Sequence, residues 1–223
     1  MECCFQSASF VNRKPPVKFF CYNLPMVTFD LFIRAVTFLG FLFVEVYKLR
    51  NNLVLKNSEY KVATTPFNQT KFLGFYKKMD RAFFLILLVQ VLTPYPQVGS
   101  FFVAGFISTA VRAILAILFC IATILYFVSR EQLGVYWTPA GCVKQDHKLI
   151  NFGIFKYEKH PIYAMYFLMM LFSQLAFFSF GVLFPIFTYL RYRALAILEE
   201  SILKKELGGY TKYARETKSI FLI

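Results

Sequence analysis

Five apolar tracts alternate with polar segments along the chain. Four of them approach the roughly 20 residues that a helix needs to cross a bilayer core of roughly 30 Å, and one is shorter but almost free of polar side chains. The tracts cover residues 26–47, 79–93, 101–128, 162–178 and 179–198. Because runs of this length exceed a typical strand and suit a spanning helix, the pattern predicts an all-α integral membrane bundle of about five transmembrane helices.

The last two tracts run together, with only Ser179-Phe180-Gly181 between them. So short a connection predicts a tight helical hairpin over about 162–198. Pro161 stands just before it, and proline suits the first turn of a helix, where its missing N–H would have no partner. We therefore expect the helix to begin at Pro161, with His160 at or beside its N-cap.

The order of the tracts also predicts how the chain is divided. Residues 1–128 form an N-terminal membrane region with three spans. Residues 129–223 hold a polar loop, the helical hairpin and a charged cytoplasmic tail, in which Gly208-Gly209 is expected to stop the last long helix.

Composition supports the membrane assignment, because 58% of the residues are apolar and only 17% are charged, whereas about one quarter are charged in a soluble domain. The net charge is +13, and Lys and Arg gather in 48–81, 129–160 and 191–223. Five spans place all three segments on one side, as expected for cytoplasmic segments. Since no soluble basic domain is formed, we expect no nucleic-acid partner.

The cysteines and the charged residues within the apolar tracts indicate which kinds of bond and site the chain can form. Five cysteines show no CxxC pair and no metal-ligand spacing with histidine, so we expect neither a disulfide framework nor a metal site. Asp30 and Arg34 lie four residues apart on one helix face, which predicts a structural pair. Arg112, in the middle of the third tract, needs a carboxylate, a water-filled cavity or a partner chain, and a substrate-facing role stays open for it.

Three ionisable features meet on the predicted cytoplasmic side. Lys159 and His160 precede the fourth tract, Glu199 and Glu200 follow the fifth, and His147 lies in the loop between the third and the fourth. The hairpin brings the first two features together. The sequence therefore predicts a mixed-charge site at the mouth of the hairpin, suited to a zwitterionic ligand while a lipid approaches from the side.

Three motifs in this half of the chain carry a family resemblance. They are LGVYW at 133–137, HKLINFGIFKYEKHPIYA at 147–164 and EESILKKELGGYTKY at 199–213. Their order and spacing resemble those of the isoprenylcysteine carboxyl methyltransferases and related phospholipid methyltransferases, over residues 130–223.

The resemblance implies a membrane methyltransferase that uses S-adenosylmethionine on a lipidic or prenylcysteine-type acceptor, with membrane lipids as partners. It implies a cofactor site made by His147, Gly153, Lys159, His160, Tyr163, Glu199 and Glu200. The residue types suit this role, because a helix N-terminus offers free N–H groups to a carboxylate and glutamates can hold an ammonium or hydroxyls. We expect the endoplasmic reticulum as the compartment, with the mitochondrial inner membrane as the alternative.

Departures from the family pattern keep alternatives open. Lys159 stands where the family has arginine, and Leu195 stands where an arginine precedes the paired glutamates. One alternative is a catalytically degenerate member of this fold that serves as a structural subunit of a larger membrane complex. Another is a membrane sterol reductase, although Ile162 occupies the position where those enzymes have asparagine.

The individual side chains have structural alternatives as well. His160 could simply cap a helix, and Glu199 and Glu200 could form a solvated helix end. Tyr163 and Trp137 could be aromatic anchors at the membrane interface.

Overall fold

The structure is a computed structural model that describes residues 24–55, 61–62, 69–93, 106–138, 142–143, 147–178 and 180–221. The helices within these ranges are α1 (Leu24–Leu55), α2 (Gln69–Leu92), α3 (Phe106–Leu133), α4 (Pro161–Ala176), α5 (Leu183–Glu206) and α6 (Tyr210–Glu216). The short 3-10 helices are η1 (Gly134–Tyr136), η2 (Gly153–Lys156) and η3 (Phe180–Val182). The strands β1 (Lys61–Val62) and β2 (Cys142–Val143) pair antiparallel over two residues each. The predicted all-α class is confirmed.

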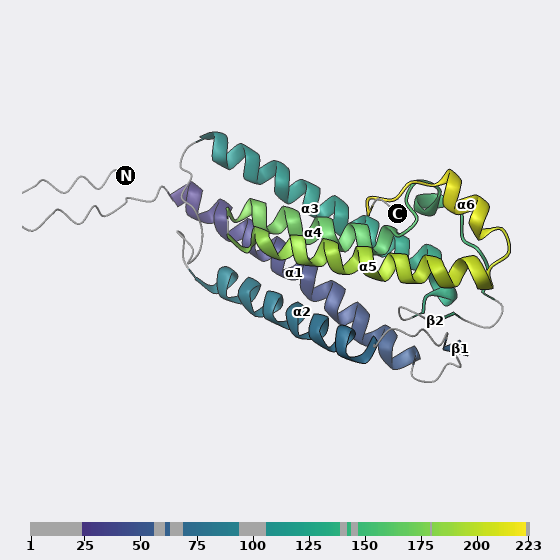
Figure 1. Cartoon of the computed structure of the whole chain (residues 1–223). Helices are drawn as coiled ribbons and strands as arrows, with labels where there is room; N and C mark the ends of the chain where they lie inside the picture. The colour runs from purple at the N-terminus through teal and green to yellow at the C-terminus, as the bar shows by residue number, and fades with distance from the viewer. Residues whose placement is uncertain are drawn as a thin grey trace, which may run out of the picture.

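The five long helices lie side by side and alternate in direction (Figure 1). The end of α3, the start of α4, the end of α5 and all of α6 gather at one end of the bundle. The start of α3, the end of α4 and the start of α5 lie at the other end. The end of α1 and the start of α2 lie at the first of these ends as well, so the described parts of the basic segments 48–81, 129–160 and 191–223 lie mainly at the same end (Figure 1).

Each apolar tract coincides with one helix, but the boundaries differ. The helix predicted to begin at residue 179 begins at Leu183 instead, because a turn with Phe178 at φ +47° and the 3-10 turn η3 intervene. Pro185 then falls in the first turn of α5, where its lack of an N–H does not matter. Residues 101–105 and Ser179 lie outside the described residues.

One helical stretch in the described ranges, Thr109–Tyr136, is long and apolar enough to cross a membrane. Arg81–Leu92 and Pro161–Ala176 are apolar but shorter. The helices α1 and α5 are long enough, but they carry charged side chains within their length. The number of five membrane crossings therefore stays a prediction.

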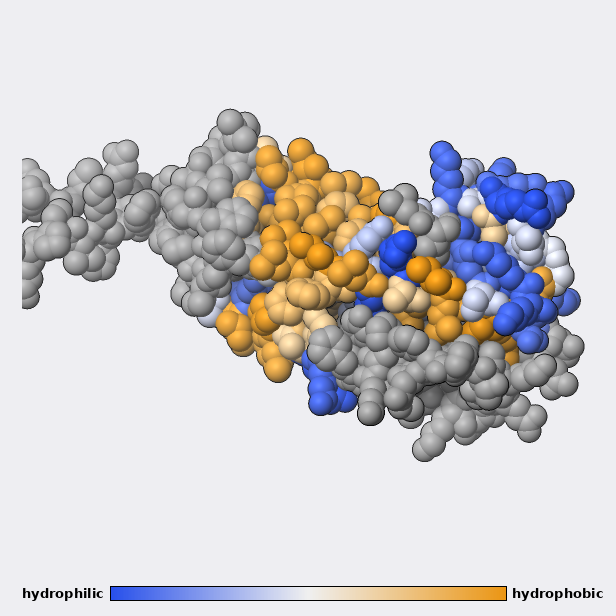
Figure 2. Space-filling view, in the orientation of Figure 1, coloured by the Kyte–Doolittle hydropathy of each residue, from blue (hydrophilic) through white to orange (hydrophobic). Residues whose placement is uncertain are grey.

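The surface of the bundle divides into an apolar wall and a polar end. Figure 2 shows hydrophobic residues along the middle of the bundle and hydrophilic ones at the end that carries α6. Exposed large apolar side chains include Leu31, Phe32, Phe43, Leu85, Ile114, Ile117, Ile121, Ile124, Ile186 and Phe187. A continuous apolar wall of this kind is costly in water and ordinary in lipid.

Aromatic rings fill the core where the first four helices meet. Phe41 of α1 is 1% exposed, and its ring lies 5.6 Å from Phe83 of α2, 5.4 Å from Phe119 of α3 and 6.2 Å from Tyr166 of α4. Burying rings of this size contributes most of the packing energy of such a core. These contacts bring α1 and α2 against the helices that carry the motifs.

A charge cluster holds the end of the bundle opposite α6. Asp30 accepts from Arg34 at 2.5 Å, as predicted, and also pairs with Arg112. Arg34 donates to the carbonyl of Gln90 at 3.1 Å, and Arg112 donates to the carbonyl of Ala176 at 2.8 Å. Both carbonyls belong to C-terminal turns of helices, whose partial negative charge favours cations. Arg112 thus has the carboxylate that its depth requires, which was the first of the three alternatives given for it.

Candidate functional site

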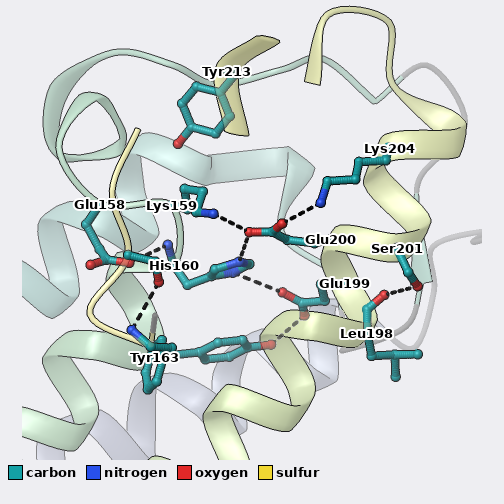
Figure 3. A network of polar contacts seen from close by, with 12 residues as sticks. Glu158, Lys159, His160, Tyr163, Leu198, Glu199, Glu200, Ser201, Lys204 and Tyr213 are labelled. Atoms are coloured by element: carbon teal, nitrogen blue, oxygen red, sulfur yellow. Dashed lines mark hydrogen bonds and ion pairs between the residues drawn. The ribbon is translucent and has the colours of Figure 1, made fainter. Parts of the chain in front are cut away.

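The start of α4 places His160 and Lys159 beside the C-terminal half of α5 (Figure 3). Pro161 occupies the first helical position and His160 the N-cap, as predicted. The imidazole makes no capping hydrogen bond. It lies instead between the two glutamates, with Nδ1 3.6 Å from Glu199 and Nε2 3.7 Å from Glu200. The interpretation of His160 as a simple side-chain cap is therefore wrong.

Glu200 is the centre of a buried ion network. Glu200 is 5% exposed. Its carboxylate lies 2.7 Å from the Lys159 ammonium and 2.9 Å from the Lys204 ammonium. Buried charges of this kind persist only when they are paired. Glu200 is thus not part of a solvated helix end.

Glu199 faces the other way and keeps an exposed edge. Its carboxylate accepts a hydrogen bond from the Tyr163 hydroxyl at 2.5 Å, and its side chain is 22% exposed. The Tyr163 ring stacks on Tyr192 at 4.7 Å, with the His160 ring parallel to it at 6.0 Å. Tyr163 is therefore packed inside the site rather than spread along the membrane interface as an anchor.

The network shifts two pKa values in opposite directions. Burial lowers the pKa of His160, but Glu199 and Glu200 outweigh burial, so the pKa is raised above 6.5. Burial raises the pKa of Glu200, but His160, Lys159 and Lys204 together hold it well below its usual 4.5. Both shifts favour a charged His160 beside charged glutamates.

A cleft opens next to this network, between the start of α4, the end of α5, α6 and the segment that follows α3. It encloses about 850 Å³ of empty space, part of it open to solvent. Its aromatic and polar lining includes Tyr136, Trp137, His147, Phe155, Lys159, His160, Tyr163, Glu199, Tyr210 and Tyr213. Its aliphatic lining includes Leu133, Ile150, Ile162 and Leu203.

The sequence of this part of the chain matches a known family. Residues 114–205 match the sequence model of the isoprenylcysteine carboxyl methyltransferase (ICMT) family. This segment is ICMT-like. The resemblance drawn from the three motifs is thereby confirmed, and no curated protein matches the chain.

All seven predicted site residues lie in the ICMT-like segment, but not all of them line the cleft. Five of them line the cleft: His147, Lys159, His160, Tyr163 and Glu199. Glu200 stands behind His160 and binds the two lysines. Gly153 is not among the cleft-lining residues, and its part is structural.

Gly153 joins the loop of the ICMT-like segment to the end of α3. It adopts φ +61°, and a Cβ there would lie 2.3 Å from the Gln132 side chain. That side chain accepts a hydrogen bond from the N–H of Ile154 at 3.0 Å. Only glycine combines this left-handed backbone with so close an approach.

We expect Gly153→Ala to lower the free energy of unfolding by about 1–3 kcal/mol, because it adds backbone strain and displaces Gln132. Gly208→Ala is the matched control, since a Cβ at Gly208 would meet nothing within 4 Å. Thermal unfolding in detergent measures both. Equal shifts for the two variants would contradict this role of Gly153.

The C-terminal residues beyond the ICMT-like segment complete the site, and sequence reasoning missed most of them. One oxygen of Glu158 accepts from the N–H of His160 at 3.1 Å and the other from the N–H of Ile220 at 2.7 Å. Tyr213 donates to the carbonyl of Phe155 at 2.6 Å, and burial chiefly raises its pKa to about 12. Gly209, at φ +83°, makes the predicted turn that aims α6 back over the cleft. No local pattern predicts the contact between Glu158 and Ile220, because the two residues lie 62 positions apart.

Proposed function

We propose that the cleft of the ICMT-like segment binds S-adenosylmethionine and that the protein transfers a methyl group to a lipidic acceptor of the prenylcysteine type. One observation carries the proposal. Five of the residues predicted from the motifs, together with the aromatic side chains of α6, line a single cleft, and most of its lining belongs to the segment that matches a methyltransferase family.

The residues of the cleft fit the chemistry of this cofactor. Tyr136, Trp137 and Tyr210 offer ring faces to an adenine and to a sulfonium cation. The exposed edge of Glu199 can hold an ammonium or ribose hydroxyls. The first-turn N–H groups of α4 have no acceptor within their helix, so they can meet a carboxylate.

The side chains act by binding and alignment. Once bound, the cofactor supplies an electrophilic methyl group on a positively charged sulfur. Direct displacement needs no covalent intermediate on the protein, so the cleft contributes by fixing the approach angle and excluding water. Glu200, Lys159 and Lys204 hold His160 in place, since their ion network fixes the ring from behind.

The surroundings of the cleft favour a lipidic acceptor. Its aliphatic lining adjoins a bundle whose outer wall is apolar, so the acceptor's chain can lie in lipid while its polar group reaches the cleft. We propose the endoplasmic reticulum as the compartment.

A catalytically degenerate structural subunit is the second candidate function. The observation that favours it is that the Lys159 ammonium pairs with Glu200 and offers the cleft no planar guanidinium.

Transfer of a tritiated methyl group from S-adenosylmethionine to farnesylcysteine in detergent micelles tests the activity. We expect transfer by the parent protein and a loss of about 10- to 100-fold in Glu199→Gln, since a charge-assisted hydrogen bond is removed. Glu216→Gln is the control, because its carboxylate is 64% exposed and does not line the cleft. Cofactor binding without transfer to any lipidic acceptor would favour the structural subunit.

A further inference from the structure

The segment that follows α6 folds back against α4 and α5. This C-terminal segment comprises residues 217–221 and lies beyond the ICMT-like segment, which ends at residue 205. It has no helical structure after Thr217, yet its Phe221 ring is 0% exposed. Because five residues in an irregular conformation cannot bury a phenyl ring by themselves, the ring is covered by the helices on which the segment lies.

Hydrogen bonds attach the C-terminal segment to both helices of the hairpin. The N–H of Lys159, before α4, donates to the carbonyl of Lys218 at 3.1 Å. The N–H of Ile220 donates to the Glu158 carboxylate at 2.7 Å, and the Tyr189 hydroxyl of α5 donates to the carbonyl of Ile220 at 3.4 Å. The chain joins α4 to α5 at the opposite end of the bundle (Figure 1). The segment therefore ties the two helices together at the end that holds the site.

A row of aromatic rings leads from Phe221 to the cleft. The Phe221 ring lies 5.4 Å from the Tyr189 ring and 6.5 Å from the Tyr192 ring. Tyr192 in turn stacks on Tyr163, with their centroids 4.7 Å apart and an interplanar angle of 14°. The Tyr163 hydroxyl donates to Glu199 (Figure 3). Tyr163 and Glu199 line the cleft, whereas Tyr192 and Phe221 do not, so Phe221 reaches the cleft through two intervening rings.

The orientation of Glu199 depends on this row of rings. One carboxylate oxygen accepts from Tyr163, and the other lies 3.6 Å from Nδ1 of His160. Removal of a buried ring leaves a cavity into which its neighbours relax in part, and a cavity at Phe221 would lie beside Tyr192. Since stacked rings are in contact over their faces, a shift of Tyr192 would move Tyr163 and lengthen its hydrogen bond to Glu199.

We propose that Phe221 is a positioning residue that acts through Tyr192 and Tyr163 to hold the Glu199 carboxylate in the cleft. The inference rests on the proposed function, in which Glu199 binds the ammonium or the ribose hydroxyls of the cofactor. It extends the site to a residue outside the ICMT-like segment. Because the Phe221 ring touches no ligand, its contribution is to the geometry of Glu199.

Two measurements on Phe221→Ala test the proposal. The first is NMR titration of the His160 imidazole without cofactor, in which the pKa of His160 should fall, because Glu199, which helps to raise it, moves away. The second is calorimetric titration with S-adenosylmethionine, for which the affinity should fall about 10-fold, as weakening of one charge-assisted hydrogen bond predicts. Phe221→Leu refills most of the cavity and should return both values close to those of the parent.

Phe177→Ala is the matched control for a loss of stability. Phe177 is 1% exposed and follows the last residue of α4, at the opposite end of the bundle. Its removal should lower the unfolding temperature, as Phe221→Ala does, and should leave the pKa of His160 and the affinity for S-adenosylmethionine unchanged. If Phe221→Ala does not fold, Phe221→Val takes its place, with smaller falls of the same sign.

The outcomes separate this proposal from the proposed function. The same pKa of His160 in Phe221→Ala as in Phe177→Ala would overturn the proposal, and so would a lower pKa with an unchanged affinity for S-adenosylmethionine. Absence of S-adenosylmethionine binding by the parent would contradict the proposed function instead. The comparison of the pKa values would then still decide whether Phe221 positions Glu199.

Discussion

Replacing Asp30 with asparagine is expected to lower the free energy of unfolding by about 3–5 kcal/mol, because it leaves two buried guanidinium groups without their shared carboxylate. The side chains of Arg34 and Arg112 are 5% and 7% exposed. Each keeps its bond to a helix carbonyl, but partial dipole charges cannot replace a full negative charge. Chemical or thermal unfolding in detergent micelles measures the loss.

Glu45→Gln is the matched control for Asp30→Asn, since it removes a carboxylate from the same helix. Its partner is Lys48, and the two side chains are 39% and 31% exposed. Ion pairs of this exposure contribute about 0–1 kcal/mol. A loss in Asp30→Asn no larger than in the control would show that the cluster is not what holds this end of the bundle.

Glu200→Gln, at the end of the bundle that carries α6, is expected to lower the free energy of unfolding by a comparable amount. Unlike Asp30→Asn, it should also change how stability depends on pH. In the parent, the raised pKa of His160 contributes stability that is complete below pH 6.5 and is lost as pH rises through the folded value. The lowered pKa of Glu200 contributes stability that is complete above pH 4.5 and is lost as pH falls through the folded value. The network should therefore be most stabilising between about pH 4.5 and 6.5.

In Glu200→Gln, the loss of stability at low pH that protonation of Glu200 causes in the parent disappears. The pKa of His160 falls because one of its two neighbouring carboxylates is gone. Since Lys159, 3% exposed, then loses its ion pair with Glu200, the free energy of unfolding should fall by about 3–5 kcal/mol at pH 6. The chain has two histidines, so NMR titration of their imidazoles, assigned with His147→Asn, measures the pKa directly. An unchanged pKa of His160 in this variant would contradict the network.

Local patterns in the sequence were enough to predict the helices and several of their ends. The proline at 161 marks the start of α4, the glycine pair at 208 and 209 marks the turn into α6, and the spacing of Asp30 and Arg34 marks a pair on one helix face. Each of these features depends on neighbours within about one helical turn. The motif resemblance also predicted that side chains far apart in the sequence, such as His160 and Glu199, belong to one site.

Contacts between distant segments escaped prediction for a physical reason. The second arginine on Asp30 comes from α3, and Glu158 reaches Ile220 across 62 residues. No periodicity or residue spacing in the sequence predicts either contact, because tertiary packing alone brings the partners together. The backbone of Gly153 is a related case: its glycine is visible in the sequence, but its contact with Gln132 depends on where α3 ends.

Calorimetric titration of the purified protein with S-adenosylmethionine tests the central claim most directly. We expect saturable binding by the parent and a loss of affinity of at least about 10-fold in His160→Ala, since a charged hydrogen-bonding group in the cleft is removed. Lys212→Ala, at a side chain that is 81% exposed, should bind as the parent does. Absence of binding by the folded parent protein would contradict the assignment of the cleft as a cofactor site.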